Sequence, residues 1–449
     1  MTLRTKIFLL LILAIISALP SMALTGKWRG ELTVGTNKLP LVFGFTEQPD
    51  GTTTATMDSP QQNVRDLPLE VMFLSADSLS VACKMIGAEY NAKNEPDRIV
   101  GTFSQRGYKL PLILTPELSL IERRPQTPQP PFPYIEKDTV FYSADSTRLA
   151  GTLTMLPQIS AKCPVVVMVT GSGPQNRDEE IFEHRPFAVI ADYLARNGVA
   201  SFRYDDRGVA SSEGGFATAT LDTFKEDAEA ALKFVKESDA FGKAGILGHS
   251  EGGTIALSIA ADGDPDFIIT LAGAAVPLKE ILLDQNRRSL DANGIAGVQK
   301  ESSLRLLELL FDTITKQHKS GQTAPIDIER LCRDNNLEVT PVVMESVKRS
   351  NSTRNAYFDS LVSSDPTDDM KKIKCRVLAI NGTKDTQVNA DSNLEAIARN
   401  VRNVEIKRME GLNHLMQHAH TGEVDEYGAI RETISPEVLQ IIGNFILNQ

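Results

Sequence analysis

The segment from Pro164 to Thr170 reads PVVVMVT, and it constrains the fold more than any other part of this sequence. An apolar run without polar alternation is typical of a strand covered on both faces, as in a parallel sheet. Helical segments at 187–197, 221–237 and 254–261 alternate with further predicted strands, which implies right-handed crossovers on one sheet. The predicted strands are 140–142, 149–155, 164–170, 199–204, 244–247, 267–272, 376–380 and 404–408, the first two forming a hairpin.

The region between Pro277 and Met370 is helical and charged, and it contains no clear strand. Ser303 to Thr313 is one of its amphipathic helical stretches. Because this region is inserted between two predicted strands of the sheet, we interpret residues 277–370 as a helical cap.

Residues 24–120 have a different pattern, with short alternating segments separated by turns such as Pro49-Asp50-Gly51. This spacing predicts a small antiparallel all-β domain, either a barrel or a sandwich. A proline-rich segment at 121–134 follows, and its composition favours an extended linker that marks a domain boundary. The α/β domain then occupies residues 135–449. The predicted β segments are 28–34, 39–45, 52–57, 67–74, 98–103 and 108–114.

The first residues have the composition of a cleavable signal peptide over positions 1–23. Arg4 and Lys6 precede an apolar run from Ile7 to Leu19, and small residues follow at Ser21 and Ala23. A membrane anchor is the alternative, but a helix that spans a bilayer needs about 20 apolar residues. We therefore expect cleavage after Ala23, export to the periplasm or the medium, and no membrane span in the mature chain.

Composition excludes several classes of protein. Hydrophobic residues make up 41% and charged residues 23%, as in an ordinary folded chain. The formal charge is −11, so nucleic acid and anionic membranes are poor partners. The four cysteines, Cys83, Cys163, Cys332 and Cys375, form no CxxC motif, and they support neither a zinc site nor a redox pair. No metal and no organic cofactor is expected.

The run from Ile246 to Gly253 contains the sharpest motif, Gly-His-Ser-Glu-Gly, between a predicted strand and a predicted helix. A nucleophile at such a turn has a strained backbone that lifts its hydroxyl above the sheet. Gly248 and Gly252 remove side chains that would collide there. Ser250 is therefore the candidate nucleophile, and a serine that merely caps the helix is the alternative.

A serine hydroxyl needs a base, and in this arrangement an acid and then a histidine follow the serine in the chain. His414 lies after the last predicted strand, on a loop at the carboxyl edge of the sheet. His318 falls in the helical insert. His418 and His420 are expected on the surface, although either could be the base if the loop register differs.

The acid of such a triad should follow the preceding strand, 376–380. Asp385 does so, and Asp365, Asp368 and Asp369 are weaker candidates because they precede that strand. A carboxylate in this position holds the imidazole in the required tautomer.

An oxyanion hole needs two backbone donors. One is expected from the residue after the nucleophile, Glu251, and the other from the loop after an earlier strand. The loop from Thr170 to Pro174 suits that role, and we assign the Ser172 N–H to it.

At these residues the chain resembles the α/β-hydrolase superfamily, and within it exported bacterial serine esterases related to the serine-aminopeptidase-like branch. The resemblance runs from about Lys137 to the C-terminus. It implies a Ser250–Asp385–His414 triad, oxyanion amides at Ser172 and Glu251, and a sheet covered by helices with a cap insert. The matching segments are GHSEGG at 248–253, TGSGPQNRDE at 170–179, HRPF at 184–187, ADYL at 191–194 and RYDDRG at 203–208.

Two features near this site have more than one interpretation. Asp205, Asp206 and Arg207 form either a structural ion-pair network or a substrate contact, and we favour the network. Glu251 either binds a cationic group of the substrate or faces solvent at the start of a helix. The family usually has glycine at the position of Ala210, so this sequence departs from its pattern there.

Together these features predict a serine hydrolase that cleaves small carboxylic esters through an acyl-enzyme on Ser250. An aminopeptidase or acyl-peptidase of the same fold is the first alternative. The second alternative is a protein that binds glycan or envelope polymer through its β domain, with a relic hydrolase domain. The sequence does not indicate an oligomeric state.

Overall fold

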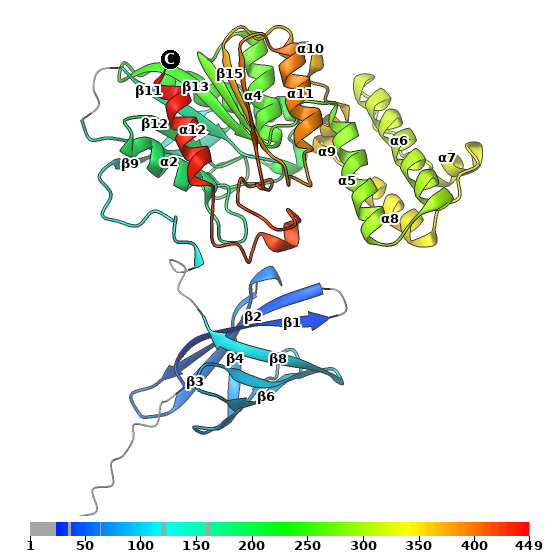
Figure 1. Ribbon diagram of the computed structural model, residues 1–449. Helices are drawn as coiled ribbons and strands as arrows, with labels where there is room; N and C mark the ends of the chain where they lie inside the picture. Colours follow the sequence, from blue (N-terminus) through cyan, green and yellow to red (C-terminus); the bar gives the residue numbers. More distant parts are fainter. Residues whose placement is uncertain (1–23, 35–36, 63, 118–122, 159–161, 449) are drawn as a thin grey trace, which may run out of the picture. The chain divides into compact units, whose positions relative to one another are not determined.

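The computed structural model describes residues 24–34, 37–62, 64–117, 123–158 and 162–448 (Figure 1). The predicted signal peptide at 1–23 lies outside the described residues. The chain divides into two compact units, with the boundary between Ser119 and Leu120, and each unit is described by itself.

The amino-terminal unit is a closed barrel of eight antiparallel strands in sequence order (Figure 1). The last strand pairs back to the first, with Trp28 opposite Pro116, so the barrel and not the sandwich is correct. Two of its strands, β5 and β6, escaped the sequence prediction because they are short and rich in small or polar residues. The strands are β1 (Gly26–Val34), β2 (Asn37–Glu47), β3 (Thr53–Ser59), β4 (Val64–Leu74), β5 (Ser78–Cys83), β6 (Ala88–Asn94), β7 (Ile99–Gln105) and β8 (Tyr108–Pro116).

Large side chains fill the barrel interior. Phe43 and Tyr90 pack with ring centroids 5.2 Å apart, and Leu112 and Leu114 are fully buried beside them. The buried Tyr90 hydroxyl lies within hydrogen-bonding distance of the carbonyl oxygens of Ile99 and Leu112, so its polar atom is satisfied.

The second unit is built on one eight-stranded sheet, as predicted for an α/β protein. The strand order is β16-β15-β14-β13-β11-β12-β10-β9, with β9, β10 and β12 joined by antiparallel pairs and the remaining neighbours parallel. Each predicted strand is present within a few residues. The strands are β9 (Ile135–Tyr142), β10 (Arg148–Met155), β11 (Cys163–Val169), β12 (Ala200–Tyr204), β13 (Phe241–His249), β14 (Phe267–Leu271), β15 (Arg376–Gly382) and β16 (Val404–Met409).

Helices cover both faces of this sheet, which explains the apolar run in β11. Val165 and Val167 face a core shared with one set of helices, and Val166 and Met168 face the other set. The first set is α3 (Leu221–Lys236), α4 (Glu251–Asp262) and α11 (Ala390–Asn400). The second set is α2 (Pro186–Arg196) and α12 (Pro436–Leu447).

The insert between β14 and β15 is helical throughout its regular elements, and α5 to α8 stand beside the sheet domain in Figure 1. It has its own apolar core, in which Leu306, Leu310 and Phe311 are buried. The α9 helix belongs partly to the main domain, since Tyr357 packs into the core shared with α3 and α4. The helices are α5 (Leu278–Ala292), α6 (Gly297–Lys319), α7 (Ile328–Asp334), α8 (Pro341–Ser352), α9 (Ala356–Ser363) and α10 (Thr367–Met370).

The proline-rich segment packs on the second unit. The Arg124 guanidinium donates to the carbonyl oxygens of Phe182 and Gly428, and the Gln126 side chain donates to that of Ile434. This part of the segment is therefore fixed by polar contacts to the α/β unit. In the described part of the chain, no helix combines the length and apolarity required to cross a bilayer.

Candidate active site

Ser250 lies at the turn that joins β13 to α4, with φ 53° and ψ −116°. Positive φ is strained for a residue with a side chain, and such strain is common at nucleophile turns. The flanking glycines make the turn possible, because a Cβ on Gly248 would overlap the Gly252 carbonyl and one on Gly252 would overlap the Val169 carbonyl. The Ser250 side chain does not cap α4, so the capping alternative is not supported.

Asp385 and His414 meet at the carboxyl edge of the sheet, on the loops after β15 and β16. The distance from Asp385 Oδ2 to His414 Nδ1 is 2.8 Å. The other carboxylate oxygen accepts the N–H groups of Gln387 and Val388, each at 2.8 Å. Both side chains are buried. Three acceptor contacts suit an ionised carboxylate that holds a proton on Nδ1 of the imidazole.

The turn with Ser250 lies next to the loop with His414. His249 Nε2 is 3.0 Å from the carbonyl oxygen of His414, and the two imidazole centroids are 4.8 Å apart. Among the described residues the Ser250 hydroxyl makes no hydrogen bond, either with the His414 ring or with another group.

The loop after β11 supplies the candidate oxyanion donor. The Gly171 N–H donates to Glu179 Oε1 at 2.7 Å, and the Gly173 N–H donates to the Tyr357 hydroxyl at 3.2 Å. Between them, the Ser172 N–H has no acceptor among the described residues. Glu251 is the first residue of α4, so its N–H has no partner inside the helix. Among the described residues, neither of the two predicted donors therefore has an intramolecular acceptor.

Glu251 is only 6% exposed, so of the two alternatives for this residue the solvent-facing one is wrong. Its Oε2 accepts a hydrogen bond from the Tyr357 hydroxyl at 2.5 Å. Burial raises the pKa of the Glu251 carboxyl to about 7, although the bond from Tyr357 acts in the opposite direction. Burial, together with the negative charge of Glu251, also raises the pKa of Tyr357. Tyr357 escaped the sequence analysis because it lies in the cap, 106 residues from its partner.

Two of the three charged residues after β12, Asp205 and Arg207, form ion pairs as expected. Arg177 pairs with Asp205 at 2.7 Å, and Arg207 pairs with Asp227 at 2.6 Å. Asp206 has a different role, because it accepts hydrogen bonds from the Thr170 hydroxyl in the candidate oxyanion loop, at 3.0 Å, and from the N–H of Gln175 directly after that loop, at 2.9 Å. Burial raises the pKa of Asp206 to about 8 despite these bonds.

The other histidine candidates lie elsewhere. His318 is on α6, and His418 is 63% exposed and pairs with Glu432 at 2.9 Å. The backbone N–H of His420 donates to Glu426.

The weaker candidates for the acid of the triad also have other partners than His414. Asp368 and Asp369 pair with Lys371 and Lys372 at α10, and Asp365 accepts the N–H of Thr367. Within the described residues no group of three His, Cys, Asp or Glu side chains is arranged to hold a metal ion.

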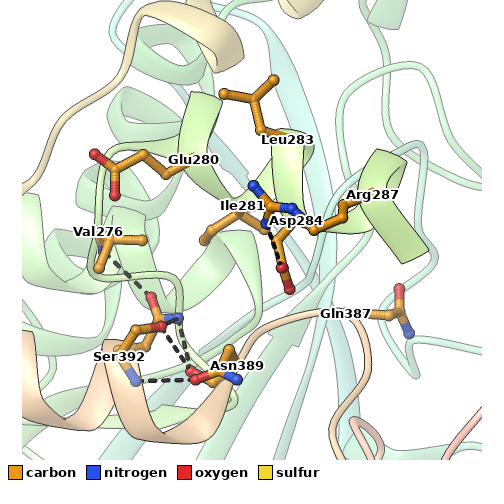
Figure 2. A pocket seen from close by; sticks show the side chains of 10 residues that line it. Val276, Glu280, Ile281, Leu283, Asp284, Arg287, Gln387, Asn389 and Ser392 are labelled. Atoms are coloured by element: carbon orange, nitrogen blue, oxygen red, sulfur yellow. Dashed lines mark hydrogen bonds and ion pairs between the residues drawn. The ribbon is translucent and has the colours of Figure 1, made fainter. Parts of the chain in front are cut away.

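A groove of about 400 Å³ lies between α5 and the segment that leads into α11 (Figure 2). Gln387 lines it, and its N–H donates to Asp385, although Ser250, Asp385 and His414 are themselves not among the lining residues. Val276 also lines it, two residues after Ala274, whose N–H donates to the Ser250 carbonyl oxygen at 3.3 Å. The lining is mixed, with Ile281 and Leu283 beside Glu280, Asp284, Arg287, Asn389, Ser392 and Asn393.

The sheet, its helices on both faces and the cap insert confirm the α/β-hydrolase fold expected from the sequence. The sequence model of the family described as serine aminopeptidase, S33, matches residues 183–419, and the chain belongs to this family.

One curated relative is esterase EstD of Thermotoga maritima, which is 29% identical over 271 residues. The matched region covers 60% of this chain and 58% of EstD, so the chain spans less than two thirds of that relative. Among solved structures, the Pyrococcus furiosus esterase Pf2001 is 16% identical with a TM-score of 0.43, covering 70% of this chain and 91% of its own. Est1E of Butyrivibrio proteoclasticus is 18% identical with a TM-score of 0.43, covering 69% and 99%.

Proposed function

We propose that this protein is a serine hydrolase that cleaves small carboxylic esters through an acyl-enzyme on Ser250. The observation that carries the proposal is the pair of Asp385 and His414, joined at 2.8 Å on loops beside a serine at a strained strand-to-helix turn. The match to EstD favours ester hydrolysis over other reactions of the fold.

In the first step the Ser250 hydroxyl oxygen attacks the carbonyl carbon of the ester, and its proton passes to Nε2 of His414. The carbonyl oxygen becomes negatively charged and is stabilised by the N–H groups of Ser172 and Glu251. The bond to the alcohol oxygen then breaks, and that oxygen takes the proton from His414. This leaves the acyl group on Ser250 as an ester.

In the second step His414 takes a proton from water, and the water oxygen attacks the acyl carbon. Ser250 leaves with the proton held by His414, and the carboxylic acid is released. Asp385 keeps Nδ1 protonated and stabilises the imidazolium throughout. The groove beside Gln387 is the proposed binding space for one substituent of the ester, and its volume and mixed lining suit a compact, partly polar group.

The buried contact between Glu251 and Tyr357 argues against the aminopeptidase alternative. An amine-binding carboxylate has to be open to the substrate, whereas Glu251 is covered and its Oε2 is already bonded to a phenol. We therefore place esters before amides as substrates.

The test is to compare wild type, Ser250→Ala and the control Ser258→Ala, a serine on α4 away from the turn. A fluorophosphonate probe should label wild type and the control, and peptide mapping should find the label on Ser250. Ser250→Ala should lose labelling and lose hydrolysis of p-nitrophenyl esters by several orders of magnitude. A label on another residue, or ester turnover that survives in Ser250→Ala, refutes the proposal.

A series of short p-nitrophenyl esters and the matching aminoacyl p-nitroanilides would decide between the two substrate classes. We expect much larger kcat/KM values for the esters. Comparable values for the anilides would favour the aminopeptidase alternative without changing the nucleophile.

We also propose that the protein acts outside the cytoplasm, on the basis of the charged and apolar pattern of residues 1–23. Expression of the full chain followed by fractionation and amino-terminal sequencing tests this. A mature protein that begins at Leu24 supports export, and an uncleaved chain in the cytoplasm contradicts it.

A further inference from the structure

A second carboxylate–histidine pair lies directly beside the proposed nucleophile. Glu179 Oε1 is 2.8 Å from Nδ1 of His249, and it also accepts the N–H of Gly171 at 2.7 Å. The other ring nitrogen of His249, Nε2, is 3.0 Å from the carbonyl oxygen of His414. One imidazole therefore connects three parts of the site: the loop after β11, the turn with Ser250 and the loop with His414.

This inference rests on the function proposed above. We propose that Glu179 and His249 form a buried ion pair that positions the oxyanion loop, the nucleophile turn and the His414 loop relative to one another. Both are positioning residues, since the contacts that carry the proposal are with Gly171 and with the backbone of His414.

The hydrogen-bond partners determine the charge of the ring. A backbone carbonyl oxygen can only accept, and so can an ionised carboxylate. A neutral imidazole has one N–H, so it can satisfy only one of these two acceptors. With acceptors at both nitrogens, His249 carries a proton on each and is an imidazolium ion, balanced by the Glu179 carboxylate.

Of the charged groups around the His249 ring, the Glu179 carboxylate has the largest effect on the ring. Burial by itself would lower the pKa of His249, but Glu179 outweighs it and the pKa is raised, with smaller contributions from the His414 carbonyl and Asp385. Among the described residues, the titratable His414 ring also packs against it, with the ring centroids 4.8 Å apart. Apolar residues complete the surroundings, with space for about one water molecule between them: Pro186, Phe187, Ile190, Leu271, Leu415, Met416 and Ile434.

The backbone around the pair is held tightly. Glu179 itself has positive φ, at 53°, which is uncommon for a residue with a side chain. A Cβ added to Gly171 would lie 3.3 Å from Glu179 Oε1 and 3.3 Å from the Ser250 Cβ. Gly171 therefore lies close to both the carboxylate and the proposed nucleophile, and a shift of the pair would be transmitted to the turn.

The first test measures the charge of the ring in the whole wild-type protein, by nitrogen-15 NMR of the histidine side chains between pH 5 and 9. His249→Gln identifies the signals. We expect both ring nitrogens of His249 to be protonated at pH 7 in wild type. A neutral His249 ring at pH 7 overturns the proposal, and this measurement does not depend on catalysis or on the folding of Glu179→Gln.

The second test measures the rate of fluorophosphonate labelling of Ser250 against pH. In Glu179→Gln we expect labelling to slow by about 10-fold or more, because small displacements of reacting groups are costly. We also expect the upper pH limit of labelling, the pH above which the rate declines, to fall by about 1 to 3 pH units. The reason is that His249 loses the negative charge that stabilises its imidazolium form, so it gives up its proton at a lower pH. A merely structural role would slow labelling without moving that limit.

Two substitutions of His249 separate its two contacts. His249→Asn keeps a donor near the position of Nδ1, and His249→Gln keeps one near the position of Nε2. We expect each variant to retain part of the wild-type rate of fluorophosphonate labelling. The matched control is Glu432→Gln, which removes the carboxylate of the exposed pair with His418, and its pH profile should equal that of wild type.

The outcomes distinguish this inference from the proposed function. Wild type that labels on Ser250, with Glu179→Gln equal to it in rate and pH limit, overturns the positioning role and leaves the serine hydrolase standing. Wild type that does not label overturns the proposed function and with it any catalytic role of the pair.

Discussion

Asp385 and His414 are joined side chain to side chain, with 2.8 Å between Oδ2 and Nδ1, although they are 29 residues apart in the chain. The carboxylate is held on its other side by two backbone N–H groups, so it presents a fixed acceptor to the ring. A proton kept on Nδ1 leaves the lone pair of Nε2 free. That nitrogen can then act as a base toward a hydroxyl group.

Asp385→Asn should therefore lower kcat for esters by about 10³- to 10⁴-fold and leave the fold intact. The amide can donate to Nδ1 and stabilise the wrong tautomer, with the proton on Nε2. Steady-state kinetics and circular dichroism measure the two effects. The control Asp391→Asn makes the same chemical change at a carboxylate that pairs with Arg408 on the surface, and it should behave as wild type. An Asp385→Asn variant within a few fold of wild type would exclude Asp385 from the triad.

Tyr357 links the two candidate oxyanion donors, because its hydroxyl accepts from Gly173, next to Ser172, and donates to the side chain of Glu251. Direct loss of an oxyanion donor costs about 10²- to 10³-fold in turnover. Tyr357→Phe keeps both donors but removes their common support, so we expect kcat to fall by about 10-fold with little change in KM. Tyr142→Phe removes an exposed hydroxyl and serves as the control. Unchanged kcat in Tyr357→Phe would show that the phenol is not needed to hold the loop.

The sequence alone predicted the sheet and the three candidate triad residues. The sheet was predictable because buried parallel strands are continuous apolar runs. The triad assignment stays a prediction, and it rests on the rule that the carboxyl ends of such strands meet at one edge. Ser250 is recognised from its own neighbours. Asp385 and His414 were proposed because each follows the end of a predicted strand. The order of these strands along the chain is enough to place both residues at the carboxyl edge of the sheet.

The supporting contacts could not be predicted, because they depend on how separate segments pack. Tyr357 reaches Glu251 across 106 residues, and Glu179 reaches His249 across 70. Nothing in the sequence around Glu179 distinguishes it from the neighbouring acidic residue Glu180. The solvent-facing interpretation of Glu251 failed for the same reason, since the residue that buries its carboxyl comes from the cap.

Ala210 occupies a left-handed backbone conformation, with φ 45°. This conformation costs a residue with a Cβ about 1 kcal/mol or more, and glycine adopts it freely. Ala210→Gly should therefore stabilise the folded α/β unit by about 0.5–1 kcal/mol, although glycine also gains entropy in the unfolded chain. Calorimetry of the whole protein would detect this as a higher midpoint of the α/β transition.

Ala230→Gly is the matched control for this change. Ala230 lies inside α3 at an ordinary helical position, where the same substitution costs about 1 kcal/mol. The two variants should therefore shift the same transition in opposite directions. A lower midpoint for both would contradict the conformational explanation.

Glu251 makes the stability of the α/β unit depend on pH. Its pKa is raised by burial to about 7 in the folded protein, from an ordinary value of 4.5. The folded state therefore keeps a proton that the unfolded state loses. The stabilisation linked to this proton is fully present below about pH 4.5 and is lost as the pH rises through 7. Replacing the carboxyl by an amide removes this dependence.

Below pH 4.5, the free energy of unfolding of Glu251→Gln should therefore vary with pH as that of wild type does. From pH 4.5 to about pH 8, it should rise steadily relative to that of wild type. The expected gain over that window is on the order of 2–3 kcal/mol. Neutralising Glu251 also lowers the pKa of Asp206, which its charge helps to raise, and this adds to the gain. Calorimetry of both proteins at a series of pH values measures the difference. Glu237→Gln, at the exposed end of α3, should run parallel to wild type. If Glu251→Gln also runs parallel, the carboxyl is ionised in the folded protein at neutral pH, and its bond from Tyr357 is that of a phenol to a carboxylate.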